Sequence, residues 1–123
     1  MGDSEMEEVC ARVMGWIPHP SFVRTGLSDA PWIHPATRRR SYRCPSVLRL
    51  PSHFKALLIW ASSDGRVVDI RYRKAFAPEW QCAINLPTQY PSKGRGDSPE
   101  RALACATVEW YYHRAESLPK EAP

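Results

Sequence analysis

The stretch "RVVDIRYRKAFAPEWQCAINL", residues 66–86, decides the fold. In its first half apolar side chains such as Val68 and Ile70 alternate with polar ones, and "EWQCAINL" in its second half repeats the pattern. When apolar and polar side chains alternate with a period of two, a β-strand has one apolar, buried face and one solvated face. Because the connection between the halves is short, we expect strands at 66–74 and 79–86 that pair as an antiparallel hairpin.

Apolar residues at helical spacing predict three helices around this hairpin, over about residues 4–14, 52–62 and 99–115. The second segment contains "ALLIWA", which would also suit a buried strand, so that alternative stays open. The third has small residues in its first half, which would let it lie close to a sheet. Residues 87–97 are rich in Pro, Gly, Ser and Lys and are predicted to form a loop.

The string Arg95-Gly96-Asp97 in this loop spells an integrin-adhesion tripeptide. It is followed by Ser98, a favoured N-cap residue, and by Pro99, which suits the first helical position because its missing N–H would be unpaired there anyway. We therefore interpret the string as the start of the last helix. An adhesion ligand is not expected, because the acidic start "MGDSEMEEVC" lacks the apolar core of a secretory signal.

Four segments carry a resemblance to a known family: "VCARVMGW" (9–16), "WIHPAT" (32–37), "LPSHFKALLIWA" (50–61) and, after the strand pair, "GRGDSPERALACATVEW" (94–110). In this order and spacing they resemble the phage ABA sandwich domain family, small proteins of bacteriophages and prophages. The resemblance touches most of residues 4–112. It implies a three-layer α-β-α sandwich and a phage origin, and it supplies no catalytic residues.

The chain departs from that family pattern in two places. The solvated face of the hairpin, with residues such as Asp69, Arg71 and Gln81, is too polar to be fully covered by a helix. The segment around Arg38 to Arg43 is also more basic than the resemblance leads us to expect.

Positive charge is concentrated in the middle of the chain. Residues 38–74 carry ten Lys or Arg against two acids, whereas the net charge of the whole chain is +4. The sequence predicts a basic binding face made by Arg38, Arg39, Arg40, Tyr42, Arg43, Arg49, Arg71, Arg73 and Lys74. Such a face would contact phosphates and stack tyrosines on bases, or it would anchor on an acidic protein surface. A solvated basic face without a partner is the plain alternative.

Other chemistries find little support in the sequence. Cys10, Cys44, Cys82 and Cys105 lack the spacing of a metal or redox site, and we interpret them as small buried hydrophobes without disulfides. Cys44 lies among arginines that would lower its thiol pKa, but without a partnered histidine an ordinary loop cysteine is favoured. The histidines are dispersed, and "KGRG" lacks the spacing of a phosphate-binding loop. The sequence therefore predicts no catalytic residue, cofactor or metal, and a protein that is not an enzyme.

Together these patterns predict a single α+β domain over residues 1–123, frayed at 1–3 and 117–123. No apolar run of about 18 residues exists, so we expect no membrane span and a cytoplasmic location in a host bacterial cell. The expected function is that of a small phage-encoded interaction protein. In this reading it is an anti-CRISPR-like inhibitor of a host defence system, which binds a host protein or nucleoprotein complex through the basic face. The alternative is a direct nucleic-acid-binding accessory or regulatory protein.

Three questions stay open at this point: the identity of the partner, the oligomeric state, and the role of the Trp- and Pro-rich segment 16–35.

Overall fold

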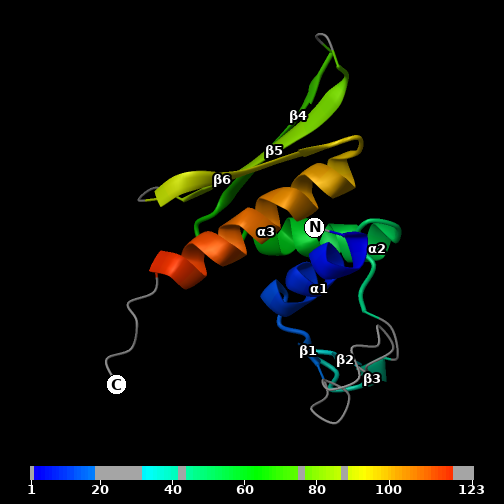
Figure 1. Cartoon of the computed structure of the whole chain (residues 1–123). Coiled ribbons are helices and arrows are strands. Elements are labelled where there is room, and N and C mark those ends of the chain that lie inside the picture. Colours follow the sequence, from blue (N-terminus) through cyan, green and yellow to red (C-terminus); the bar gives the residue numbers. More distant parts are fainter. Residues whose placement is uncertain (1, 19–31, 42–43, 75–76, 87–88, 118–123) are drawn as a thin grey trace.

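The computed structural model describes residues 2–18, 32–41, 44–74, 77–86 and 89–117. Its helices are α1 (Asp3–Val13), α2 (Pro51–Ala61) and α3 (Pro99–Ser117). The central antiparallel sheet consists of β4 (Val67–Arg73), β5 (Glu79–Leu86) and β6 (Gln89–Gly96), and a smaller sheet consists of β1 (Ile17–Pro18), β2 (Trp32–Ile33) and β3 (Arg40–Ser41) (Figure 1). The predicted α+β class, the three helices and the antiparallel hairpin are confirmed.

The hairpin has the register that its alternation requires. β4 and β5 pair antiparallel with Ile70 opposite Cys82. Val68 and Ile70 pack against the buried core, whereas Val67 and Arg71 are exposed. One strand face is therefore buried, and a slip by one residue would turn every apolar side chain to the outside. Residues 75 and 76, in the short connection, lie outside the described part of the chain.

The predicted loop at 87–97 is wrong, because most of it forms the edge strand β6. Gly94 and Gly96 lie in this strand on the face toward α3. A Cβ atom on Gly94 would lie 2.3 Å from Ala106 N and 2.4 Å from Ala102 O, so the strand backbone touches the helix backbone directly. Glycine in a strand often marks such a close approach, but in a sequence it looks the same as a turn signal.

All three helices lie on one side of the central sheet (Figure 1). α3 packs directly on β5 and β6, α2 touches β4 and α3, and α1 packs on the far side of α3. The layers thus run sheet, helix, helix, and no element of the described residues covers the outer face of the sheet. This agrees with the expectation that the polar strand face is not fully covered by a helix.

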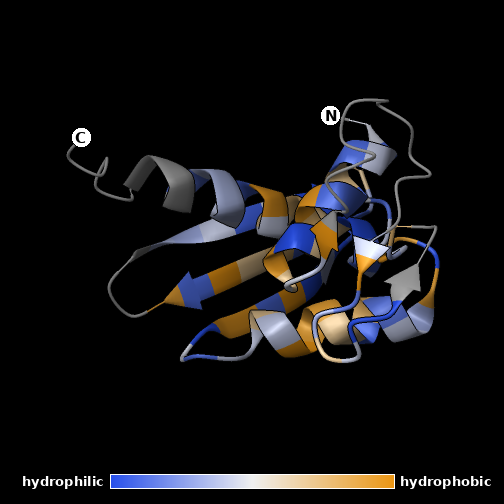
Figure 2. Ribbon diagram, turned by 90° about the horizontal axis from the view of Figure 1, so that it is seen from below, coloured by the Kyte–Doolittle hydropathy of each residue, from blue (hydrophilic) through white to orange (hydrophobic). Residues whose placement is uncertain are grey.

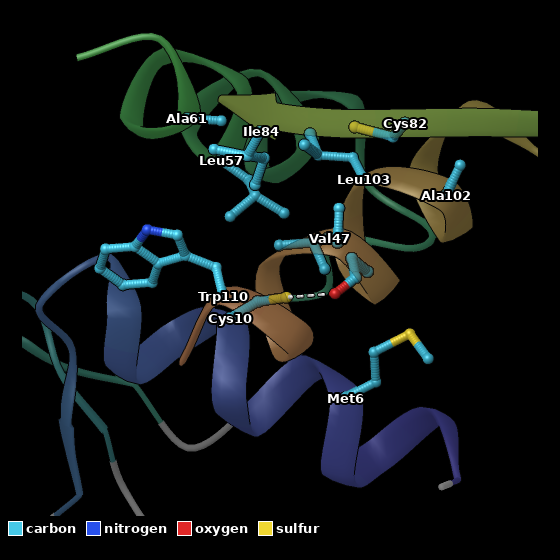
Figure 3. Close-up of a cluster of buried hydrophobic side chains, with 12 residues drawn as sticks. Met6, Cys10, Val47, Leu57, Ala61, Cys82, Ile84, Ala102, Leu103 and Trp110 are labelled. Carbon is cyan, nitrogen blue, oxygen red and sulfur yellow. Dashed lines mark hydrogen bonds between the residues drawn. The ribbon is translucent and has the colours of Figure 1, made fainter. Parts of the chain in front are cut away.

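The core lies between these layers. Figure 3 shows Met6 and Cys10 of α1 facing α3, and Leu57 of α2 beneath Ile84 of β5. Cys10 Sγ lies 4.0 Å from the carbonyl oxygen of Ala104 in α3. Figure 2 shows hydrophobic and hydrophilic residues alternating along the strands, as expected of strands with one buried face.

Ser98 and Pro99 begin α3 as predicted, whereas Arg95 and Gly96 of the RGD string are the last residues of β6. The Arg101 N–H donates to Ser98 Oγ at 3.2 Å, so Ser98 caps the helix. The Arg101 side chain donates to both carboxylate oxygens of Asp3 at 2.9 and 3.1 Å, and it lies 3.3 Å from Asp97. These contacts join the first turns of α1 and α3, and Asp3, within the segment predicted to fray, is the first residue of α1. Residues 118–123, also predicted to fray, lie outside the described residues.

Arg66 is a buried arginine at the end of α2. Its Nε and Nη2 atoms donate to the carbonyl oxygen of Trp60 at 3.2 and 2.7 Å. Its guanidinium lies 4.3 Å from the Trp60 ring centroid and 5.5 Å from that of Trp110, and the two rings meet edge to face. The last carbonyl groups of an α-helix have no i+4 N–H donor within the helix. A planar guanidinium can donate to such a carbonyl while it stacks on an aromatic ring. Arg66 therefore fastens α2 to α3 at the start of β4.

The smaller sheet gathers the two ends of the Trp- and Pro-rich segment. β1 and β3 both pair with β2, and Trp32 in β2 is buried beneath the Arg12 guanidinium of α1. His34 Nδ1 accepts the N–H groups of Ala36 and Thr37 at 3.0 and 3.1 Å, which holds the turn into β3. This segment therefore packs a small sheet onto α1, with residues 19–31 outside the described part of the chain.

The first prediction concerns the strand–helix contact. Gly94→Ala should lower the free energy of unfolding by about 2–3 kcal/mol, because the added methyl group forces β6 away from α3. Gly2→Ala is the matched control, since a Cβ at Gly2 meets no atom within 4 Å. Denaturant titration of both variants tests this, and equal midpoints would show that β6 is not in direct contact with α3.

A second prediction concerns the buried arginine. Arg66→Met should destabilise the protein by about 2–3 kcal/mol, since the Trp60 carbonyl loses the two guanidinium donors, although it keeps the Ser63 N–H, and the two indole rings lose their cation. The exposed Arg73→Met should change stability by less than about 0.5 kcal/mol. Urea denaturation followed by tryptophan fluorescence measures both, and a small loss for Arg66→Met would contradict the role given to Arg66.

Candidate binding surface on the open face of the sheet

The structure divides the predicted basic face into separate groups. Arg38, Arg39 and Arg40 lie in the β2–β3 turn and in β3, whereas Arg71, Arg73 and Lys74 lie in and just after β4. Figure 1 shows the small sheet and the β4–β5 hairpin on opposite sides of the helices. The expected gathering of these arginines on one surface is therefore not observed.

Of the other members of the predicted face, the structure describes Arg49. Arg49 is exposed just before α2, and its charge helps to lower the pKa of Asp3, after the larger effect of the Arg101 hydrogen bond. Tyr42 and Arg43 lie outside the described residues.

A different set of polar residues shares the outer face of the central sheet. The register aligns Asp69, Ala83 and Lys93 in one row across the three strands. The next row contains Arg71, Gln81 and Arg95. We call these six residues the open-face rows. They line a shallow hollow of about 530 Å³, to which Glu109 of α3 also contributes.

The hollow is deepest at Ala83 because this residue has the shortest side chain in the two rows. Ala83 occupies the centre of the first row and extends no further than its Cβ, whereas its neighbours in the rows are long. The longer side chains therefore stand around a low centre. The hollow is open to solvent, which allows a partner to enter without displacing any described element.

The charges of the rows are unevenly paired. Arg71 Nη2 lies 2.9 Å from Asp69 Oδ2, so these two residues largely neutralise each other. Lys93 and Arg95 are exposed, and within the described residues no carboxylate forms an ion pair with either side chain. The β6 side of the hollow is therefore the positive side.

Sequence reasoning missed Lys93 and Arg95 because their segment was predicted to be a loop. A signal was present in "KGRG", where charged residues and glycines alternate with a period of two. In a strand this spacing places both cations on one face and both glycines on the other. The structure puts the glycines against α3 and the cations in the open-face rows.

The rows carry no aromatic ring. In the neighbouring part of the sheet, Tyr72 and Trp80 lie opposite each other on the α3 side, with ring centroids 5.2 Å apart. Nucleobase stacking needs rings on the binding face, so the rows do not form a stacking platform. What they present is guanidinium, ammonium, amide and carboxylate groups for hydrogen bonds and ion pairs.

The cysteines do not provide a nucleophile. Burial, followed by the Glu7 and Glu8 carboxylates, raises the pKa of the Cys44 thiol to about 12, so the expected lowering by nearby arginines is wrong. Burial and then Asp69 raise the pKa of Cys82 to about 12, and burial also raises the pKa of Cys10 and Cys105. At neutral pH these thiols stay protonated, and a protonated thiol is a poor nucleophile.

The described residues carry neither a cluster of metal ligands nor a membrane-spanning helix. No three His, Cys, Asp or Glu side chains gather as metal ligands there. No helix in that part of the chain is both long enough and apolar enough to cross a membrane.

Comparison with known proteins gives no relative: no family model, no curated protein and no solved structure matches the chain.

The Cys82 thiol gives a pH prediction. Its pKa is about 12 in the folded protein against an ordinary value of 9.0, so between these pH values the folded state holds a proton that the unfolded state has lost. Its contribution to the free energy of unfolding is fully present below pH 9 and is lost as the pH rises toward 12. Denaturant titrations across this window should show a shallower loss of stability for Cys82→Ala than for the unaltered chain. Parallel losses would contradict the burial of this thiol.

Proposed function

We propose that this chain is a small interaction protein that binds an acidic segment of a partner protein in the hollow of the open-face rows. The observation that carries the proposal is the pair of exposed cations, Lys93 and Arg95, beside a low floor at Ala83. An acidic side chain entering the hollow would meet these cations, and Gln81 would offer an amide to the partner backbone. Charged rims of this kind steer association and set specificity.

A protein partner fits the rows better than a nucleic acid does. Asp69 and Glu109 both line the hollow, so its surface is mixed in charge and lacks the uniform positive charge that favours a phosphate chain. The rows also lack the rings on which unpaired bases stack. A polypeptide carries both charges and both kinds of backbone hydrogen-bonding group, which matches a surface of mixed donors and acceptors.

The resemblance to phage proteins supports a specific setting for this binding. A phage-encoded binding protein without a reactive thiol suits the inhibition of a host defence protein by occupation of its surface. We therefore propose a host defence protein or nucleoprotein complex as the partner, in the host cytoplasm. This identity rests on the resemblance, whereas the binding mode rests on the geometry of the rows.

The test compares two charge-reversal variants. K93E/R95E reverses the cations of the rows, and R38E/R39E reverses two exposed arginines of the β2–β3 turn. Each tagged chain is used to capture proteins from host lysate, and captured proteins are quantified against the unaltered chain. We expect K93E/R95E to reduce capture of the specific partner at least about tenfold, and R38E/R39E to leave it unchanged.

A second measurement addresses nucleic acid. Fluorescence anisotropy of a labelled oligothymidine should show no binding that depends on Lys93 and Arg95. If the logarithm of the binding constant falls linearly with the logarithm of the salt concentration, and K93E/R95E abolishes binding, the partner is a nucleic acid and not a protein. Equal capture by both variants would remove the rows from the binding site altogether.

A further inference from the structure

The free edge of β4 exposes unpaired backbone groups. The strand order is β4-β5-β6, so β4 and β6 are the two edges of the central sheet. The Lys93 N–H in β6 points away from β5 and donates to Glu109. Along a strand, successive residues direct their N–H and C=O groups to alternate sides. Because Lys93 points away from β5, its partner Ala83 points toward β4 and bonds Asp69 there. The neighbours of Asp69 and Arg71 in β4 therefore point the other way, so Val68, Ile70 and Tyr72 direct their N–H and C=O groups to the outer edge of β4. No described residue hydrogen-bonds these groups.

On the opposite edge, the outward N–H group is missing or bonded at three positions of β6. Pro91 has no N–H, the Lys93 N–H donates to Glu109 at 3.3 Å, and the Arg95 N–H bonds the Cys105 thiol. Natural sheets block edges in this way because an open edge pairs with another strand. β4 has no proline, glycine or bulge over its seven residues. The contrast shows one edge protected and the other left able to pair.

We propose that β4 pairs antiparallel with β4 of a second copy of this chain, with Ile70 opposite Ile70 across a two-fold axis. The two three-stranded sheets then form one continuous sheet. Ile70 and the Val68–Tyr72 pairs exchange hydrogen bonds through the backbone groups that no described residue of the single chain bonds. Such a strand-edge contact is smaller than a standard interface, so we expect a dissociation constant on the order of micromolar.

Several registers would keep the apolar faces of the two sheets on the same side, and the charged side chains of β4 favour the one centred on Ile70. When the two-fold axis passes between the two Ile70 residues, each Asp69 lies directly opposite Arg71 of the second copy. These two residues form a non-hydrogen-bonded pair, the kind of antiparallel pair in which side chains come closest. A slip to the neighbouring register in either direction sets Asp69 against Asp69 or Arg71 against Arg71. Opposite charges facing each other across strands stabilise a sheet and like charges destabilise it, so only the Ile70-centred register is favourable.

Side-chain packing on the inner face supports the same register. Tyr72 is 51% exposed in the single chain and would lie opposite Val68 of the second copy. Aromatic and β-branched residues facing each other across strands are a stabilising pair. Tyr72 already packs against Trp80 of its own chain, and Val68 of the second copy would give it a neighbour on its other side.

The experiment is a charge swap followed by sedimentation velocity over a concentration series up to about 1 mM, the weak limit of specific association. The unaltered chain should shift from the 14.0 kDa monomer to a dimer. R71D and D69R should each weaken dimerisation at least about tenfold, because each sets like charges opposite one another. The double variant D69R/R71D should restore it. R73D is the matched control, since Arg73 faces Val67 of the second copy and its loss should have little effect.

A mixing experiment makes the test independent of folding defects. R71D and D69R, each monomeric alone, should form a heterodimer when combined, because both facing pairs of residues 69 and 71 are then of opposite charge. A monomer at every concentration, no rescue in the double variant, or an equal effect of R73D and R71D would each overturn the proposal. This result does not depend on the partner of the open-face rows, since K93E/R95E leaves the β4 edge unaltered.

Discussion

The direct contact between the backbones of β6 and α3 at Gly94 is the constraint on which the rest of this structure depends. It holds α3 close enough for Cys105 and Glu109 to reach the outer edge of β6, and so that edge is closed. It also positions Arg101, which connects the beginnings of α1 and α3 through Asp3. A strand held flat against a helix must direct its long side chains outward, and this is why Lys93 stands on the open face.

The two faces and two edges of the central sheet have different physical roles. The inner face is apolar and packed, and the outer face is polar and uncovered within the described residues. The β6 edge has N–H groups that contact α3, and no described residue bonds the outward backbone groups of the β4 edge. If two copies join at β4, their open-face rows lie on the same side of one wider sheet, so a partner with two acidic segments could contact both. Linked binding of that kind strengthens association without any new contact.

Charge along the chain does not predict charge in space. The run from Arg38 to Arg40 is the densest basic segment of the sequence, yet the small sheet carries it to the opposite side of the helices from Arg71 (Figure 1). Arg71 itself is largely neutralised by Asp69, two residues earlier on the same strand face. Arg66, which belongs to the same basic stretch, is buried against Trp60 and takes no part in any surface. A count of charges gave no means of separating these three environments.

The sequence by itself determined the elements whose cause is local. Alternation in residues 66–86 set the hairpin and its buried face, helical spacing set the three helices, and Ser98 with Pro99 set the start of α3. Tertiary structure alone decided what depends on contacts between distant residues. Gly94 is a strand residue rather than a turn because α3 leaves no room for a Cβ. Burial, and after it the Glu7 and Glu8 carboxylates of α1, raise the pKa of the Cys44 thiol. The physical reason is that local patterns record the preferences of single elements, whereas a close approach or a shared surface is created only when two elements meet.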